Sequence, residues 1–183
     1  MKKAIFTALF LSIFCGCTTA PEKPSFTKGV NQLANVGRVN NAARLYEGGN
    51  LLFVPFRAGS GVLATPELDQ LAMMTVKGFI ETLNKKSMPF IILNASNADA
   101  AELVVRGHIT KLDESAGIKN WIGAKSVSLA IEGEIIDQKT GERIVYFSHQ
   151  KSASEKAKSK MVLAYEIGQE MAQFIIEQFK QKK

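Results

Sequence analysis

Beyond residue 17 the 183-residue chain contains no cysteine, because its only two cysteines are Cys15 and Cys17. The body of the protein therefore cannot hold a disulfide within itself and must be stabilised by its own core. The body also lacks a cysteine nucleophile and a Gly-x-Ser-x-Gly motif, and Ser60 has no evident base beside it. We therefore expect a protein that is not an enzyme.

Histidine is equally scarce, with His108 and His149 as the only two. Both fall on predicted strands among polar neighbours, and neither has a second ligand at the spacing that a metal site needs. We interpret them as solvated side chains on a sheet face. The sequence thus predicts no metal and no cofactor.

The chain has no apolar run long enough to cross a membrane as a helix. Its most apolar stretch, residues 4–14, follows Lys2 and Lys3 and would rise only about 16 Å against a hydrocarbon core of roughly 30 Å. A short apolar core after a cationic start is typical of an export signal. We therefore expect residues 1–16 to be a signal peptide.

The end of this segment, residues 12–18, reads SIFCGCT and resembles a lipobox, the processing motif of bacterial lipoproteins. The small residue that this motif needs before the modified cysteine is Gly16, whereas Cys15 follows the bulky Phe14, and Phe14 itself stands where leucine is usual. The resemblance implies cleavage between Gly16 and Cys17, with acyl chains on Cys17. An ordinary signal cut near Ala20 is the alternative.

Several acyl chains would anchor the protein stably, since one chain alone holds a protein only marginally. Thr18 follows the cysteine, and similarity to enterobacterial sorting then favours the outer membrane, with the domain facing the periplasm. Without Lys2 and Lys3 the net charge falls from +6 to +4, and no basic stripe is concentrated along the chain. Nucleic acid is therefore not an expected partner.

Three segments follow the signal. Residues 17–49 are polar and rich in asparagine, which indicates a lipidated cysteine followed by a tether of about 30 Å as a flexible coil. A single folded domain is predicted for residues 50–183. It begins with the apolar run 50–56, which is long enough for a buried strand and too short for a helix.

A helix should follow, with Thr65 as its N-cap and Pro66 in its first position. Lys85, Lys86 and Pro89 end the apolar stripe of this helix. The loop of residues 59–65, between strand and helix, lies where phosphate-binding loops occur, yet it lacks the Lys-Ser/Thr of a P-loop and the spacing of a dinucleotide fingerprint. A flexible connection is favoured, and a small-ligand or glycan site on this loop is the alternative.

Four more strands are predicted, at residues 89–93, 103–112, 127–135 and 144–149, before a last helix from about residue 155 to 180. The fourth strand alternates apolar and polar residues most regularly, and Gly141 suits the positive φ of the hairpin loop that follows it. The helix between strands one and two implies a right-handed parallel crossover. The fold class is therefore α+β, a single mixed five-stranded sheet in β-α-β-β-β-β-α order with two helices on one face.

Three stretches resemble the periplasmic domain shared by the curli secretion lipoprotein CsgG, the N-terminal domain of TolB and LpoB, the lipoprotein activator of a peptidoglycan synthase. They are NLLFVPF (50–56), AELVVRGHITK (101–111) and SVSLAIEGEIIDQKTGERIVY (126–146). A fourth, GIKNWIGAKS (117–126), resembles uncharacterised lipoproteins of the same group. Members that form pores need two long amphipathic hairpins, for which residues 113–125 and the tail after Ile144 leave no room.

Three residues are candidates for interaction. Trp121 lies between glycines in a loop, where aromatic side chains often anchor partners, although packing at the sheet end explains it equally well. Glu132 and Glu134 share one strand face at roughly 7 Å, and an exposed polar face is the favoured interpretation. We expect a scaffold or accessory protein of the envelope that binds protein partners or itself, through a second sheet face of intermediate polarity.

The first testable prediction concerns the anchor. Mass analysis of the intact membrane form should show a chain that begins at Cys17 and carries several acyl groups. Cys17→Ser should release the protein from membranes, because no other anchor is expected, whereas Cys15→Ser should leave it bound. A chain that is unmodified and begins near Pro21 would contradict this prediction.

Overall fold

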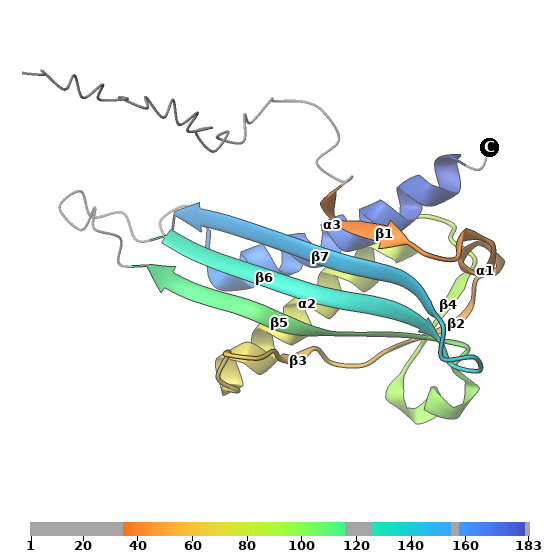
Figure 1. Cartoon of the computed structure of the whole chain (residues 1–183), viewed down its shortest axis with the longest axis horizontal. Coiled ribbons are helices and arrows are strands. Elements are labelled where there is room, and N and C mark those ends of the chain that lie inside the picture. The colour runs from red at the N-terminus through yellow and green to blue at the C-terminus, as the bar shows by residue number, and fades with distance from the viewer. Residues whose placement is uncertain (1–34, 116–125, 155–157, 182–183) are drawn as a thin grey trace, which may run out of the picture. The chain divides into compact units, whose positions relative to one another are not determined.

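A computed structural model describes residues 35–115, 126–154 and 158–181 of the chain. These residues form one α+β unit, in which a mixed sheet carries two long helices (Figure 1). The elements in chain order are β1 (Gly37–Val39), α1 (Ala42–Glu47), β2 (Gly49–Phe53), β3 (Arg57–Ala58), α2 (Pro66–Asn84), β4 (Phe90–Leu93), the 3₁₀ helix η2 (Ala95–Ala100), β5 (Leu103–Ser115), β6 (Ser126–Asp137), β7 (Arg143–Ser154) and α3 (Lys160–Gln181).

The sheet is larger than the sequence indicated. The α+β class and the mixed sheet are confirmed, but the count of five strands is wrong, because the described residues form seven. The short α1 and η2 are present in addition to the two predicted helices, so that the β-α-β-β-β-β-α order is incomplete as well. The two additional strands, β1 and β3, have only three and two residues, too few to produce a period-2 pattern. The sheet therefore takes in residues well before Asn50, where the folded domain was expected to begin.

The strand order is β1-β7-β6-β5-β2-β4, and β3 also pairs with β5. β2 is parallel to β4, as predicted for strands joined by a crossover helix, and it is parallel to β5 as well. β5, β6 and β7 form an antiparallel meander, and β1 adds to β7 antiparallel. β7 continues to Ser154, beyond its predicted end at His149, so that α3 begins at Lys160 rather than near residue 155.

Local signals in the sequence explain where α2 and the β6–β7 hairpin begin and end. The Thr65 hydroxyl accepts the Leu68 N–H at 3.2 Å, and Pro66 takes the first helical position, as predicted. In the hairpin, Gly141 has a φ of +71°, which most residues with a Cβ avoid. Leu129 and Ile131, on the inward face of β6, are completely buried.

Both long helices cover the same face of the sheet, behind it in Figure 1. They approach each other through glycine: a Cβ on Gly168 would lie 2.0 Å from the Thr75 carbonyl oxygen, and one on Gly78 would lie 2.2 Å from that of Tyr165. The inward side chains of β5, β6 and β7 pack beneath this pair in one continuous core. Among the described residues, no helix covers the opposite sheet face.

The second prediction follows from that close approach. Alanine normally stabilises a helix interior by roughly 0.5–1 kcal/mol relative to glycine. In Gly168→Ala the added methyl group meets backbone, and overpacking of this kind costs about 1–3 kcal/mol. We therefore expect the free energy of unfolding, measured with urea, to fall by about 1–2 kcal/mol. Gln70→Ala, on the exposed side of α2, is the control and should change it by less than about 0.5 kcal/mol. Equal stability of both variants would contradict the close packing.

Candidate functional site

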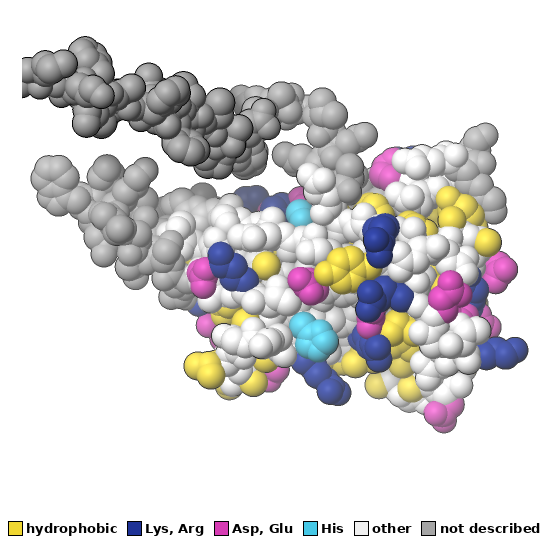
Figure 2. Space-filling model, viewed as in Figure 1, with side chains coloured by type: hydrophobic (Ala, Val, Ile, Leu, Met, Phe, Trp, Pro, Cys, Tyr) yellow, Lys and Arg dark blue, Asp and Glu magenta, His cyan; other side chains and the backbone are white. Residues whose placement is uncertain are grey.

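The surface left free by the helices is the strongest candidate for a functional site. It comprises the outward side chains of β1, β5, β6 and β7, and we call it the open face. On β6 the outward positions are the even-numbered residues, whereas the odd-numbered ones are buried. Figure 2 looks onto this face and shows Lys and Arg side chains gathered across its middle.

Strand register places the charged side chains in rows across the open face. Arg106 lies opposite Glu134, Glu134 opposite Tyr146, and Tyr146 opposite Arg38. In the next row, Arg57 lies opposite His108, and His108 lies opposite Glu132. The sheet thus brings together residues that are up to 108 positions apart in the chain, from Arg38 to Tyr146. The set formed by Arg38, Arg57, Arg106 and Arg143, together with Glu134 and Tyr146, is here called the arginine patch.

Glu134 is the centre of the arginine patch. Its two carboxylate oxygens accept hydrogen bonds from Arg106 Nε at 2.9 Å and Arg143 Nε at 2.5 Å. Burial alone would raise the pKa of Glu134, but the hydrogen bonds from Arg106 and Arg143 outweigh it and lower the pKa below its usual value. Glu134 is therefore ionised at neutral pH, and its single charge is shared between two guanidinium groups.

An aromatic ring completes the patch. The Arg143 guanidinium carbon lies 5.5 Å from the centre of the Tyr146 ring, a cation–π arrangement. Arg38 donates from Nε to Asn40 Oδ1 at 3.0 Å and is exposed, as is Arg57. Arginine and tyrosine are the residue types that most often dominate protein interfaces.

The predicted pair of glutamates does lie on this face, but the two residues have different surroundings. Glu132 is exposed, whereas only 18% of the Glu134 side chain is exposed. Because both oxygens of Glu134 are engaged by arginine, the two carboxylates do not form a proton-sharing pair. Whether either residue contacts a partner stays a prediction. The other candidates, Trp121, Gly16 and Cys17, lie outside the described residues.

The two histidines differ as well. His108 is exposed on the open face, as predicted, but the expectation of a solvated His149 is wrong. His149 faces α3, with 14% of its side chain exposed, and its Nε2 contacts Glu170 Oε2. The regular β6–β7 pairing sets His149 opposite the buried Ile131, on the sheet face that α3 covers.

A network of ion pairs surrounds His149. Lys151 Nζ lies 2.6 Å from Glu170 and 3.0 Å from Glu166. Burial alone would raise the pKa of Glu170, but hydrogen bonds from His149 and Lys151 lower it to about 2. These contacts tie β7 to α3. In the part of the chain that the structure describes, no group of three or more His, Cys, Asp and Glu residues could hold a metal ion.

The loop of residues 59–65 offers little to a phosphate. The Gly59 N–H donates to the Ile109 carbonyl at 2.9 Å, and the Val62 N–H donates to Gly59 at 3.1 Å. These two amides are therefore not available to a ligand. The hollow beside the loop is mostly apolar, lined by Val54, Pro55, Phe56, Arg57, Ala58, Ala64, Leu68 and Asp69.

A second polar region lies at the sheet end that carries the β6–β7 turn. Asp137 is 6% exposed and accepts from Arg44 Nε at 2.5 Å and from the Lys139 and Thr140 N–H groups at 3.0 and 2.9 Å. The hydrogen bond from Arg44, with that from the Thr140 backbone, lowers its pKa to about 2. This pairing holds α1 against the turn.

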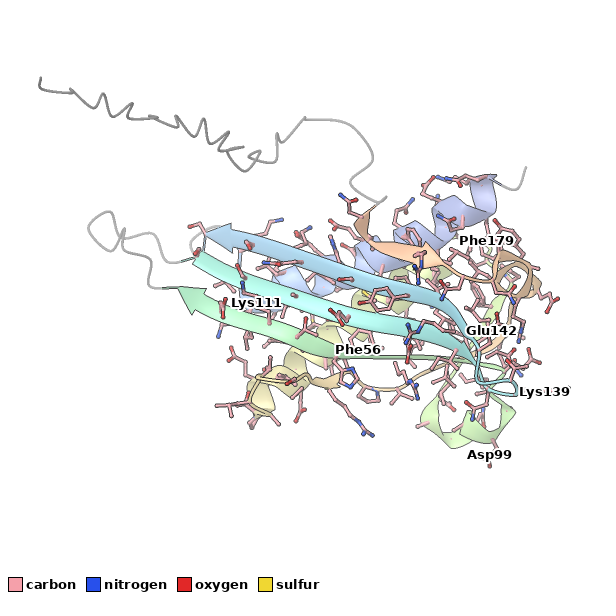
Figure 3. The ribbon with its side chains drawn as sticks, in the orientation of Figure 1. Phe56, Asp99, Lys111, Lys139, Glu142 and Phe179 are labelled. Carbon is pink, nitrogen blue, oxygen red and sulfur yellow. The ribbon has the colours of Figure 1, made fainter. Side chains whose placement is uncertain are left out.

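Asp137 lines a hollow together with Glu47, Glu102 and Lys139. Glu102 is exposed, and Asp99 is exposed three residues before it in η2. Figure 3 shows Asp99, Lys139 and Glu142 at this end of the molecule. Sequence reasoning missed the region, because its members come from α1, η2 and the β6–β7 turn.

Comparison with known proteins identifies the fold but no family. No family model matches the chain, and no curated protein matches it either. A dodecamer of PelC from Paraburkholderia phytofirmans is similar with a TM-score of 0.52 and 12% identity, over 76% of this chain and 95% of that one. Lipoprotein GNA1162 from Neisseria meningitidis is similar with a TM-score of 0.44 and 10% identity, over 73% and 99%. At these identities the likeness to PelC shows the fold alone, and the second likeness carries no argument.

Within the described ranges, no helix combines the length and apolar character that a membrane span requires.

The third prediction concerns the Asp137 pairing. The folded-state pKa of Asp137, about 2, lies below its ordinary value of 3.8. Its contribution to stability is therefore complete above about pH 5 and is lost as the pH falls toward 2. Asp137→Asn should be less stable than the unmodified protein near neutral pH, and this difference in unfolding free energy should shrink between about pH 5 and pH 2. Glu132→Gln, on the exposed open face, is the control. A difference that does not change with pH would contradict the assignment.

Proposed function

We propose that this chain is a non-enzymatic accessory protein or scaffold of the bacterial envelope, which acts by associating with other protein chains and with copies of itself. The observation that carries the proposal is the open face, a sheet surface that no helix of the described ranges covers and that brings arginine and tyrosine together. Its mixture of charged, aromatic and small polar side chains is typical of a reversible interface rather than of a core or a fully solvated surface.

The chemistry of the described residues supports a role without catalysis. The carboxylates whose pKa values are lowered are Glu134, Asp137, Glu166, Glu170 and Glu177, and each is paired with a basic side chain. Perturbed pKa values at an active site usually belong to groups poised in a cleft. Here they accompany ion pairs that hold strands, turns and helices together.

Placement in the envelope rests on the N-terminal sequence. A signal of residues 1–16, acylation of Cys17 and a tether that ends before β1 would hold the domain near a membrane. Thr18 after the cysteine favours the outer membrane, with the domain facing the periplasm. Resemblance to the CsgG, TolB and LpoB group supports the same location. The segment between β5 and β6 has only residues 116–125, which are too few for a long membrane hairpin. We therefore propose that the protein associates with other chains and does not form a pore.

Self-association is favoured over a purely heterologous role. The similar PelC structure is a dodecamer, and rings arise when a head-to-tail contact between identical chains closes. A small-ligand or glycan role for the loop of residues 59–65 is less well supported, because the Gly59 and Val62 amides already donate to backbone oxygens.

The fourth prediction tests self-association. The Cys17→Ser form of the exported chain, freed from its anchor, should show a mass above that of a monomer in light scattering at tens of micromolar, and crosslinking of the lipidated form in membranes should trap the same species. A monomer in both experiments would leave only a heterologous partner.

A further inference from the structure

The arginine patch has more positive charge than its own acids neutralise. Its four guanidinium groups lie among two carboxylates, Glu134 within the patch and Glu132 one row away. Glu134 forms ion pairs with both Arg106 and Arg143. Arg38 and Arg57 have no acidic partner in the described part of the chain. The surplus is therefore displayed on an exposed surface.

Each guanidinium of the patch still has donors to offer. Arginine has five N–H donors, and the hydrogen bonds that Arg38, Arg106 and Arg143 donate to side chains use Nε. The terminal NH₂ groups are suited to carboxylates, which they bind in a forked geometry. Tyr146, stacked with Arg143, adds apolar area beside these donors. The chemistry of the patch therefore fits a protein surface that carries several carboxylates.

The chain itself has such a surface. Asp99 and Glu102 are exposed and have no ion-pair partner within the described residues. Glu47 has 69% of its side chain exposed, and its Oε2 lies 3.6 Å from the Arg44 guanidinium. We call Glu47, Asp99 and Glu102 the acidic rim. Two basic residues, Arg44 and Lys139, line the hollow beside the rim. Arg44 is paired with Asp137, whereas Lys139 is exposed.

The rim and the patch do not neutralise each other within one molecule. In the described part of the chain no ion pair joins the rim to the patch, because Glu47 lies beside Arg44 while Arg106 and Arg143 both pair with Glu134. The two surfaces are exposed and opposite in charge, and they are therefore complementary between two copies of the chain.

We propose that the arginine patch of one copy binds the acidic rim of a second copy. The proposal rests on the proposed function and specifies the two surfaces that meet in self-association. Because both partners are exposed side chains, the contact forms reversibly and weakens as salt screens the charges.

The test uses two charge-reversed forms of the full exported chain in the Cys17→Ser background. The patch variant is Arg38→Glu with Arg57→Glu, which leaves the Arg106–Glu134–Arg143 pairing intact. The rim variant is Asp99→Lys with Glu102→Lys. The matched controls reverse a charge at exposed positions of α2. Lys77→Glu is the control for the patch variant, and Asp69→Lys is the control for the rim variant.

Sedimentation of each protein alone should show that both variants weaken self-association at least about tenfold, while the two controls assemble like the unmodified chain. Raising the salt from about 50 mM to about 500 mM should weaken the unmodified assembly by a similar factor, as the Debye length falls from above 10 Å to a few ångströms.

Mixing the two variants is the decisive measurement. The patch variant keeps an intact rim and the rim variant keeps an intact patch, so that native mass spectrometry of the mixture should show a complex of one chain of each. Circular dichroism melting of each variant confirms folding, and Arg38→Gln with Arg57→Gln, which removes charge without reversing it, should also weaken assembly.

Assembly of both variants at the unmodified strength would overturn this inference and leave self-association standing through another surface. A mixture that stays monomeric would overturn it as well, because the two surfaces would then not meet. A monomeric unmodified chain at low salt would instead remove self-association itself, and with it this inference, and would leave the proposed function with a heterologous partner only.

Discussion

The close contact between α2 and α3 is the constraint on which the rest of the structure depends. Gly78 and Gly168 let the two helix backbones approach so closely that a methyl group at either position would overlap a carbonyl oxygen. A compact pair of this kind fits on one face of the sheet, and the core lies between the pair and the inward side chains of β5, β6 and β7. Both long helices are then on the same side, and no other described helix covers the opposite face.

Strand register, and not closeness in the sequence, determines which side chains meet on the open face. Arg106 and Arg143 reach Glu134 from neighbouring strands, and one carboxylate cannot neutralise two guanidinium groups. The face is therefore held in a defined arrangement and remains positively charged. A rigid charged surface on a domain that we expect to be tethered to a membrane suits association with other chains, since tethering raises the local concentration of the copies.

Much of the fold was predictable because its signals are local. The Thr65–Pro66 helix start, the alternation along β6 and the positive φ of Gly141 each depend on residues close in the chain. Other features were not predictable, for physical reasons that differ. β1 and β3 are too short for a pattern, and a register shift between Ile109 and Lys111 moves Lys111 opposite Ala130. His149 has polar neighbours in the sequence, yet the position of α3 turns it from a solvated residue into a partner of Glu170.

The amino-acid sequence by itself determined the α+β class, the parallel crossover and the hairpin, and it carries the expectation of an anchor at Cys17. These properties depend on periodicity, caps and short motifs, which act over a few residues. Only the tertiary structure decided that Arg38, Arg106, Arg143 and Glu134 form one patch and that Asp99 and Glu102 form a separate rim. Those groupings depend on which strands become neighbours, and strand neighbours are chosen by the packing of the whole core.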